Sequence, residues 1–170
     1  MDRISEKILL HVNVDYIGGE PVLKAILETL SQIGKIVSVS NVYKRYTSVP
    51  SLDSRANLEL VAKLITRMEI NDVLNIIRAI REMPPKSLSH PVELTILTFG
   101  DKVWMSPELT LPYPTLHSDG LILMCACEVD ADFVHPILKK SLREMAVPQA
   151  ETVSEFYLQG GRLVTSLSSP

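Results

Sequence analysis

Apolar residues recur along the chain at two spacings, and these spacings predict its strands and helices. Residues 8–14 and 92–99 are mostly apolar and rich in β-branched side chains, which is typical of strands. Residues 35–46 form a further β-like run. Residues 57–66 are predicted as a strand as well, although their Leu, Glu and Lys content also suits a helix.

Helical spacing recurs in three segments. In residues 20–34 apolar side chains return every three or four positions, and a proline suits the first turn. A second helix is expected from Asn71, a residue type that caps helices, up to the segment 83–91, whose prolines exclude regular structure. A third helix is expected over residues 133–145, after Pro136.

The remaining segments are predicted as loops and extensions. Residues 47–56 are polar and read as a loop. The apolar run that contains Cys125 and Cys127 is expected to be a strand with both thiols on one side. In the tail, residues 156–164 hold a Gly-Gly pair between apolar runs and predict a hairpin.

The order of these elements predicts the fold class. A β-α-β-β-α-β order indicates an α+β protein with a ferredoxin-like core, in which helices pack on an antiparallel sheet. A C-terminal helix and hairpin would extend that core. At 170 residues the chain is expected to form a single domain over 1–170, with its core in 8–130 and an extension in 131–170.

Composition and charge narrow the function classes. The hydrophobic content of 46% and charged content of 22% are ordinary for a globular protein. A net charge of −3 argues against nucleic acid as a partner, since that partner favours a basic face. No apolar run approaches the roughly 20 residues that span a bilayer, so no membrane association is expected. With two cysteines and no signal-peptide pattern, a cytoplasmic protein is expected.

One stretch, residues 92–123, resembles the signature of the hydroxymethyldihydropterin pyrophosphokinases of folate synthesis. That family has Asp-Leu-Asp before an apolar run and Phe/Tyr-Gly, then Leu-Thr-Leu-Pro-His-Pro, then an Arg. Here Phe99-Gly100 and the run 109–112 match the turn and apolar positions. The similarity is weaker but in register over 8–82. The resemblance implies the same ferredoxin-like core that the periodicity predicts.

The residues that would carry the family's chemistry differ in this chain. Glu93 and Thr95 stand where the family places its two metal-binding Asp residues, so Glu93 is the candidate catalytic and metal residue and Thr95 a degenerate position. The segment 83–91, which in the family brings arginines to the phosphates, here offers only Lys86 and His90 as cations. Asp119 replaces the family Arg, and a carboxylate repels phosphate. The resemblance implies magnesium and ATP as cofactors, whereas these substitutions leave the cofactors open.

The resemblance also implies positions that bind the pterin. The family's Leu-Gly-Ser-Asn corresponds to residues 10–13, of which Leu10 and Asn13 survive. A carboxylate at the position of the family's pterin-reading Asn can accept hydrogen bonds from an amino-pyrimidine edge, and tyrosines can stack on a flat ring. The candidate substrate-binding residues are His11, Asn13, Tyr43, Tyr46, Glu59 and Tyr113.

Three functional hypotheses follow from these observations. In the first, the chain is a catalytically impaired pyrophosphokinase-like protein that acts as a pterin-binding or partner subunit in a folate or pterin pathway. In the second, it is an active enzyme with a rebuilt metal site, in which Glu93 is helped by Asp101 or Glu59. In the third, it is a ferredoxin-like interaction module that forms a homo-oligomer or docks on another protein through its tail.

Overall fold

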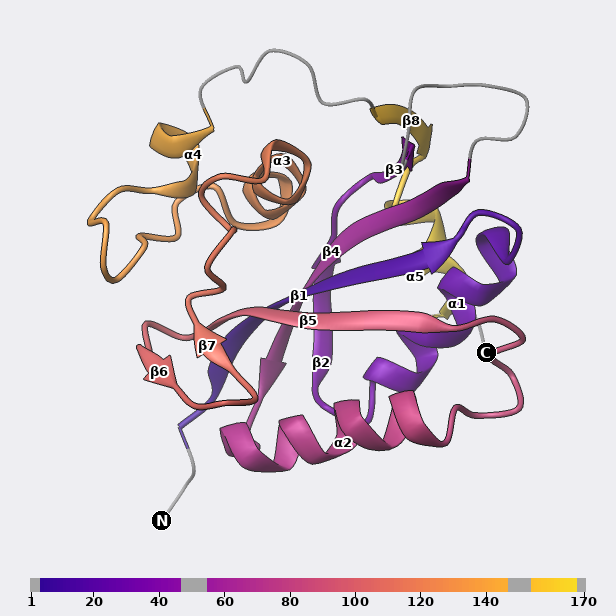
Figure 1. Cartoon of the computed structure of the whole chain (residues 1–170), viewed down its shortest axis with the longest axis horizontal. Helices are drawn as coiled ribbons and strands as arrows, with labels where there is room; N and C mark the ends of the chain where they lie inside the picture. Colours follow the sequence, from indigo (N-terminus) through magenta and orange to yellow (C-terminus); the bar gives the residue numbers. More distant parts are fainter. Residues whose placement is uncertain (1–3, 47–54, 147–153, 168–170) are drawn as a thin grey trace.

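An antiparallel sheet with helices on both faces forms the framework of the computed structural model, which describes residues 4–46, 55–146 and 154–167 (Figure 1). In this described part, the strand order is β5-β1-β4-β3-β8, and β2 also pairs with β4. The strands are β1 (Glu6–Asp15), β2 (Lys35–Val39), β3 (Val42–Tyr46), β4 (Ala56–Thr66), β5 (Val92–Phe99), β6 (Trp104–Met105), β7 (Thr110–Leu111) and β8 (Ser154–Leu158). The helices are α1 (Gly19–Leu30), α2 (Ile70–Glu82), α3 (Gly120–Asp130), α4 (Leu142–Met145) and α5 (Gly161–Leu167).

The sheet order confirms the predicted fold class. β1 and β4 lie in the middle, β5 pairs with β1, and the run β2–β3 pairs with β4, all antiparallel. This is the ferredoxin-like arrangement of a β-α-β-β-α-β chain, here extended at one edge by β8. The predicted strand over 35–46 is present as β2 and β3, interrupted where Ser40 donates its N–H to the carbonyl of Val61.

The first face of the sheet holds the larger core. Because side chains alternate across a strand, Ile8, Leu10 and Val12 of β1 point to this face and are fully buried. They pack against the apolar stripes of α1 and α2, whose buried residues recur at helical spacing. Leu163 of α5 joins the same cluster, so the C-terminal segment contributes to the core.

The second face of the sheet is only half apolar. Leu9, Val61 and Leu97 are buried beneath α3 and form a separate cluster with its side chains. The same face of the sheet carries polar side chains further along these strands, from Asn13 on β1 and Glu59 on β4. The candidate site described below lies on this polar half, which the apolar side chains of α3 do not cover.

The predicted strand around Cys125 and Cys127 is wrong, because these residues lie in helix α3. Asp119 caps that helix, since its side chain accepts hydrogen bonds from the N–H groups of Leu121 and Ile122. α3 is apolar on most sides, so its sequence lacks the alternation of apolar and polar residues every three to four positions that predicts a helix.

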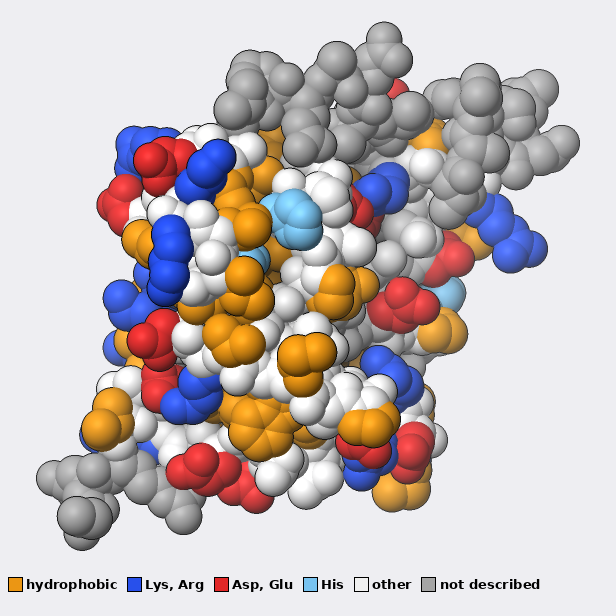
Figure 2. All heavy atoms as spheres, turned by 60° about the vertical axis from the view of Figure 1, so that its left-hand side comes forward, with side chains coloured by type: hydrophobic (Ala, Val, Ile, Leu, Met, Phe, Trp, Pro, Cys, Tyr) orange, Lys and Arg blue, Asp and Glu red, His pale blue; other side chains and the backbone are white. Residues whose placement is uncertain are grey.

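The predicted helix over 133–145 is also wrong for most of its length. Only Leu142–Met145 is helical, and it begins with a capping box at Ser141. Before it the chain forms an irregular loop closed by a bridge between Val134 and Ser141, and buried His135 accepts at Nδ1 from two backbone N–H groups of that loop. Ile137 in this loop is exposed, and Figure 2 shows apolar side chains along the middle of the face that carries α4, β6 and β7.

The predicted C-terminal hairpin is wrong as well. Residues 154–158 form strand β8, but from Gly161, the second glycine of the pair, the chain forms helix α5 rather than a second strand. Gly160 allows its backbone to pack closely against the backbone of Ser40 and does not form a hairpin turn. A Cβ at this position would lie 1.8 Å from the carbonyl oxygen of Ser40. Most of the predicted loop 47–56 lies outside the described residues. Within the described ranges, the helices are too short or too polar to cross a bilayer.

Candidate functional site

A single row of five side chains crosses the polar half of the second face. In the register of the sheet, Glu93 of β5 lies opposite Asn13 of β1, and Asn13 lies opposite Glu59 of β4. Tyr43 of β3 lies opposite Glu59, and Phe156 of β8 lies opposite Tyr43. Directly opposed residues in a sheet point to the same face. The row therefore joins two carboxylates, an amide and two aromatic rings, and four of its members were predicted from the sequence.

A second row lies beside the first and is anchored by His11. His11 pairs in register with Thr95 on one side and Val61 on the other. Its Nε2 lies 2.7 Å from Oε1 of Glu59, and because a carboxylate only accepts hydrogen bonds, the imidazole donates. Both side chains are buried, with Glu59 only 2% exposed. A buried carboxylate needs such partners, since burying it alone is costly.

Arg45 completes an ion cluster that the sequence did not suggest. Its Nε donates to the second oxygen of Glu59, and its terminal nitrogen donates to both oxygens of Asp119 at 2.8 and 3.0 Å. His11, Glu59, Arg45 and Asp119 thus form a connected chain, the buried ion cluster. It ties β1, β3 and β4 to the start of α3.

Asp119 has two roles in this arrangement. Burial alone would raise the pKa of its carboxyl, but hydrogen bonds from Arg45 and from the N–H of Ile122 outweigh that effect and hold the pKa below its ordinary value. The carboxylate therefore caps α3 and pairs with Arg45 at the same time. The expected repulsion of phosphate by Asp119 is reduced, because a guanidinium lies directly against it.

The predicted tyrosines have different surroundings. Tyr43 donates its hydroxyl to Glu128, and its ring meets Phe156 edge to face at 6.2 Å. Burial, followed by the bond to Glu128, raises the pKa of the Tyr43 phenol well above its ordinary value. Tyr46 is an odd number of residues further along β3, so it points to the opposite face, where its hydroxyl bonds to Glu155. Tyr113 lies beyond β5 and donates its N–H to Leu97.

Glu93 and Thr95 point to one side of β5, as two positions at an i, i+2 spacing do. They supply one carboxylate and one neutral hydroxyl. In the described residues, no three His, Cys, Asp or Glu side chains gather closely enough to hold a metal ion. Magnesium prefers several oxygen ligands, chiefly carboxylates, so the side chains present do not fit a pair of such ions.

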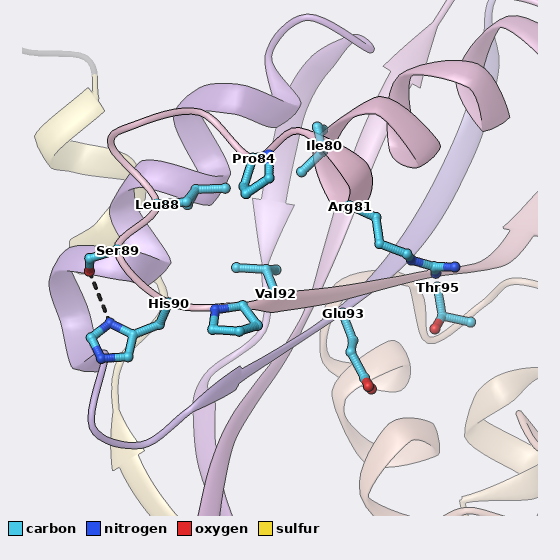
Figure 3. A pocket seen from close by; sticks show the side chains of 10 residues that line it. Ile80, Arg81, Pro84, Leu88, Ser89, His90, Val92, Glu93 and Thr95 are labelled. Carbon is cyan, nitrogen blue, oxygen red and sulfur yellow. Dashed lines mark hydrogen bonds between the residues drawn. The ribbon is translucent and has the colours of Figure 1, made fainter.

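A groove runs along the outer edge of β5 beside α2; the 83–91 segment borders one part of it, and residues 106–114, which include Tyr113, border the other. It consists of two hollows of about 720 and 510 Å³ that both reach Arg81 and Thr95. Figure 3 shows the side chain of Arg81 extending from the end of α2 to beside Thr95, while His90 bonds to Ser89 at the far end. Lys86, which the sequence offered as a possible cation, does not line either hollow.

Two arginines near the candidate site, Arg45 and Arg81, were not identified as site residues from the sequence. Arg45 follows Tyr43 by two positions, so strand alternation could have placed both on one face. Its partners Glu59 and Asp119 are 14 and 74 residues away, and no local pattern indicates that they meet. Arg81 lies at the end of α2, just before the segment in which cations were sought.

Comparison with known proteins supports the fold assignment. No family model matches the chain. Several crystal structures of Plasmodium falciparum HPPK-DHPS, a bifunctional protein that includes hydroxymethyldihydropterin pyrophosphokinase (HPPK), share the fold. The wild-type protein with pteroate superposes with a TM-score of 0.69 at 12% identity, covering 86% of this chain and 42% of that one.

A second structure gives the same result. The S436F/A437G/A613S variant with pterin and p-hydrobenzoate superposes with a TM-score of 0.67 at 12% identity, covering 85% of this chain and 44% of that one. This chain spans less than half the length of these proteins. The fold is therefore HPPK-like, and the likeness extends to the fold alone.

Proposed function

We propose that this chain is an HPPK-like protein that binds a pterin on the polar half of its sheet but does not transfer pyrophosphate at an enzymatic rate. It would act as a pterin-binding or partner subunit in a folate or pterin pathway. The observation that carries the proposal is the row Glu93, Asn13, Glu59, Tyr43 and Phe156, which lies in direct register across five strands.

The row suits a flat heterocycle with several N–H groups. The amino-pyrimidine edge of a pterin donates hydrogen bonds, and carboxylates and amide oxygens accept them. Asn13 is half-buried and Glu93 is exposed, so both are open to a ligand. Glu59 is buried and bonded to Arg45, so it contributes charge to the base of the site rather than a direct contact. The rings of Tyr43 and Phe156 offer an apolar surface at the other end of the row.

The loss of pyrophosphoryl transfer follows from charge. Moving a phosphoryl group needs metal ions and fixed cations that neutralise the oxygens of the transition state. Glu93 is the one carboxylate of the Glu93–Thr95 pair, and the 83–91 segment contains no arginine. Pterin binding has no such requirement, so it can persist where catalysis is lost.

Isothermal titration calorimetry and a coupled assay for AMP release test the two parts separately. The protein is expected to bind 6-hydroxymethyl-dihydropterin, and Asn13→Ala is expected to weaken that binding by about tenfold, the value of one or two hydrogen bonds. Magnesium-ATP with the pterin is expected to give no AMP. Absence of heat with the pterin would refute the binding part. Turnover that disappears in Glu93→Ala would establish the rebuilt enzyme instead.

A second candidate function is self-association through β8. Among the described strands, β8 pairs with β3 alone, and Phe156 is 59% exposed. An outer strand with an exposed apolar residue is a ready template for pairing. Light scattering of the wild type and of Phe156→Lys checks this, because a dimer that forms through β8 should become a monomer in the variant.

A further inference from the structure

The groove along β5 contains an arginine, Arg81, at the end of α2. Arg81 is exposed and makes no hydrogen bond or ion pair with the residues that the structure describes. Arg78, one turn earlier on α2, is paired with Glu108 instead. A planar guanidinium recognises a carboxylate by two parallel hydrogen bonds. Arg81 is therefore available to an anionic group that enters the groove.

The groove also has an apolar wall. Ile80, Leu88 and Val92 line the 720 Å³ hollow together with two prolines. In Figure 3 these side chains lie on one side of β5, while Glu93 points away from them. A ligand here would rest an apolar body on the wall and place one polar end at Arg81.

The groove is continuous with the row on the sheet. Glu93 belongs to both, because it lines the larger hollow and lies opposite Asn13 in the sheet. Thr95, where the two hollows meet, is two residues further along the strand, or about 7 Å. A substituent of a heterocycle held at Asn13 would cross from β1 to β5 at Glu93 and follow β5 to Thr95, where it reaches the groove that Arg81 lines.

We infer that the groove binds the carboxylate-bearing tail of a conjugated pterin, such as the benzoate group of pteroate. This inference rests on the proposed function, because the pterin ring would occupy the row. The charges favour a single carboxylate over a polyphosphate: one unpaired guanidinium faces the ligand, and Glu93 repels additional negative charge.

Calorimetry with pterin and with pteroate measures the contribution of the tail. Pteroate is expected to bind the wild type at least tenfold more tightly than pterin, since its carboxylate would gain a charge-assisted hydrogen bond from Arg81. Arg81→Ala is expected to remove this advantage and leave pterin binding unchanged, while Arg81→Lys keeps part of it. Arg143→Ala is the control, and it should behave as the wild type because Arg143 lines neither hollow and is already paired with Asp132.

The possible failures are distinguishable. Equal affinities for pterin and pteroate, or a pteroate advantage that survives Arg81→Ala, would overturn the inference and leave the proposed function standing. If neither compound binds, both fail. Displacement of pteroate by micromolar pyrophosphate would also overturn it, because the groove would then be a phosphate site.

Discussion

Replacing Arg45 with Met should destabilise the protein by about 2–3 kcal/mol. The substitution keeps the length of the side chain but leaves Glu59, which is 2% exposed, with His11 as its remaining partner. Removing one member of a fully buried ion pair costs about 3–5 kcal/mol. Because the Arg45 side chain is 29% exposed, we place the cost below that range. For a protein of this size the melting temperature should fall by about 5–10 °C.

Urea unfolding monitored by circular dichroism measures this cost, and a double-mutant cycle assigns it to the pair. Glu59→Gln removes the buried charge, so adding it to Arg45→Met should recover stability, with a coupling free energy of about 1–3 kcal/mol. The midpoint should move while the slope stays constant. Arg143→Met is the control, since Arg143 and its partner Asp132 are both exposed, and it should change stability by less than about 0.5 kcal/mol.

Two results would refute this reasoning. If Arg45→Met costs no more than Arg143→Met, the buried ion cluster does not stabilise the fold. If the two substitutions at Arg45 and Glu59 are additive, their ion pair is not the source of the cost.

The same cluster predicts an acid dependence. The pKa of Asp119 is lower in the folded protein than in the unfolded chain, so the unfolded state binds the proton first as pH falls. The stabilisation by Asp119 is complete above about pH 4 and is lost as pH falls through the folded pKa. Asp119→Asn should therefore flatten the stability profile below about pH 4; an unchanged acid limb would argue against the Arg45–Asp119 pair.

Three further predictions concern other parts of the fold. His135→Ala should cost about 1–3 kcal/mol because two backbone N–H groups of its loop lose their acceptor. Burial lowers the pKa of His135, so wild-type stability should lose a contribution as pH drops below about 6.5 that the variant lacks. Gly160→Ala should lower the urea midpoint because its Cβ would lie 1.8 Å from a backbone oxygen, whereas Gly161→Ala, with open space, should not. A thiol reagent at pH 8 should label Cys127 well before Cys125, since burial raises the pKa of Cys125 to about 12; equal rates would contradict this.

The strands of the ferredoxin-like core could be predicted because their apolar runs are β-branched and bounded by turn residues. Part of the candidate site could be predicted from these strands, because the alternation of side chains within β1 and β5 places Asn13 and Glu93 on one face of the sheet. Helix α3 could not be predicted from periodicity, because a helix buried on most sides is apolar all round. The sequence feature that indicates the start of α3 is Asp119, because aspartate commonly caps the N-terminus of helices.

Two other errors had a readable local signal. The pattern Ser141-x-x-Glu144 is a capping box, and it would have placed the start of α4 after Ser141 rather than near Phe133. The Gly-Gly pair after β8 suggested a hairpin, but Gly160 serves close packing against the β2–β3 interruption, a contact 120 residues away in sequence (from Ser40 to Gly160). Such a contact is set by tertiary packing and leaves no local pattern.

The charges of the candidate site support the proposal of a pterin-like ligand with one remote carboxylate over a nucleotide. On the polar half of the sheet, Glu59, Asp119 and Glu93 contribute three carboxylates. Arg45 supplies one positive charge that Glu59 and Asp119 share, and His11 donates a hydrogen bond to Glu59. The floor of the site therefore attracts N–H donors and repels anions. In the proposed binding mode, the anionic group lies where the sheet face ends, beside Arg81. On this proposal, the separation of charge favours a molecule that is donor-rich at one end and anionic at the other.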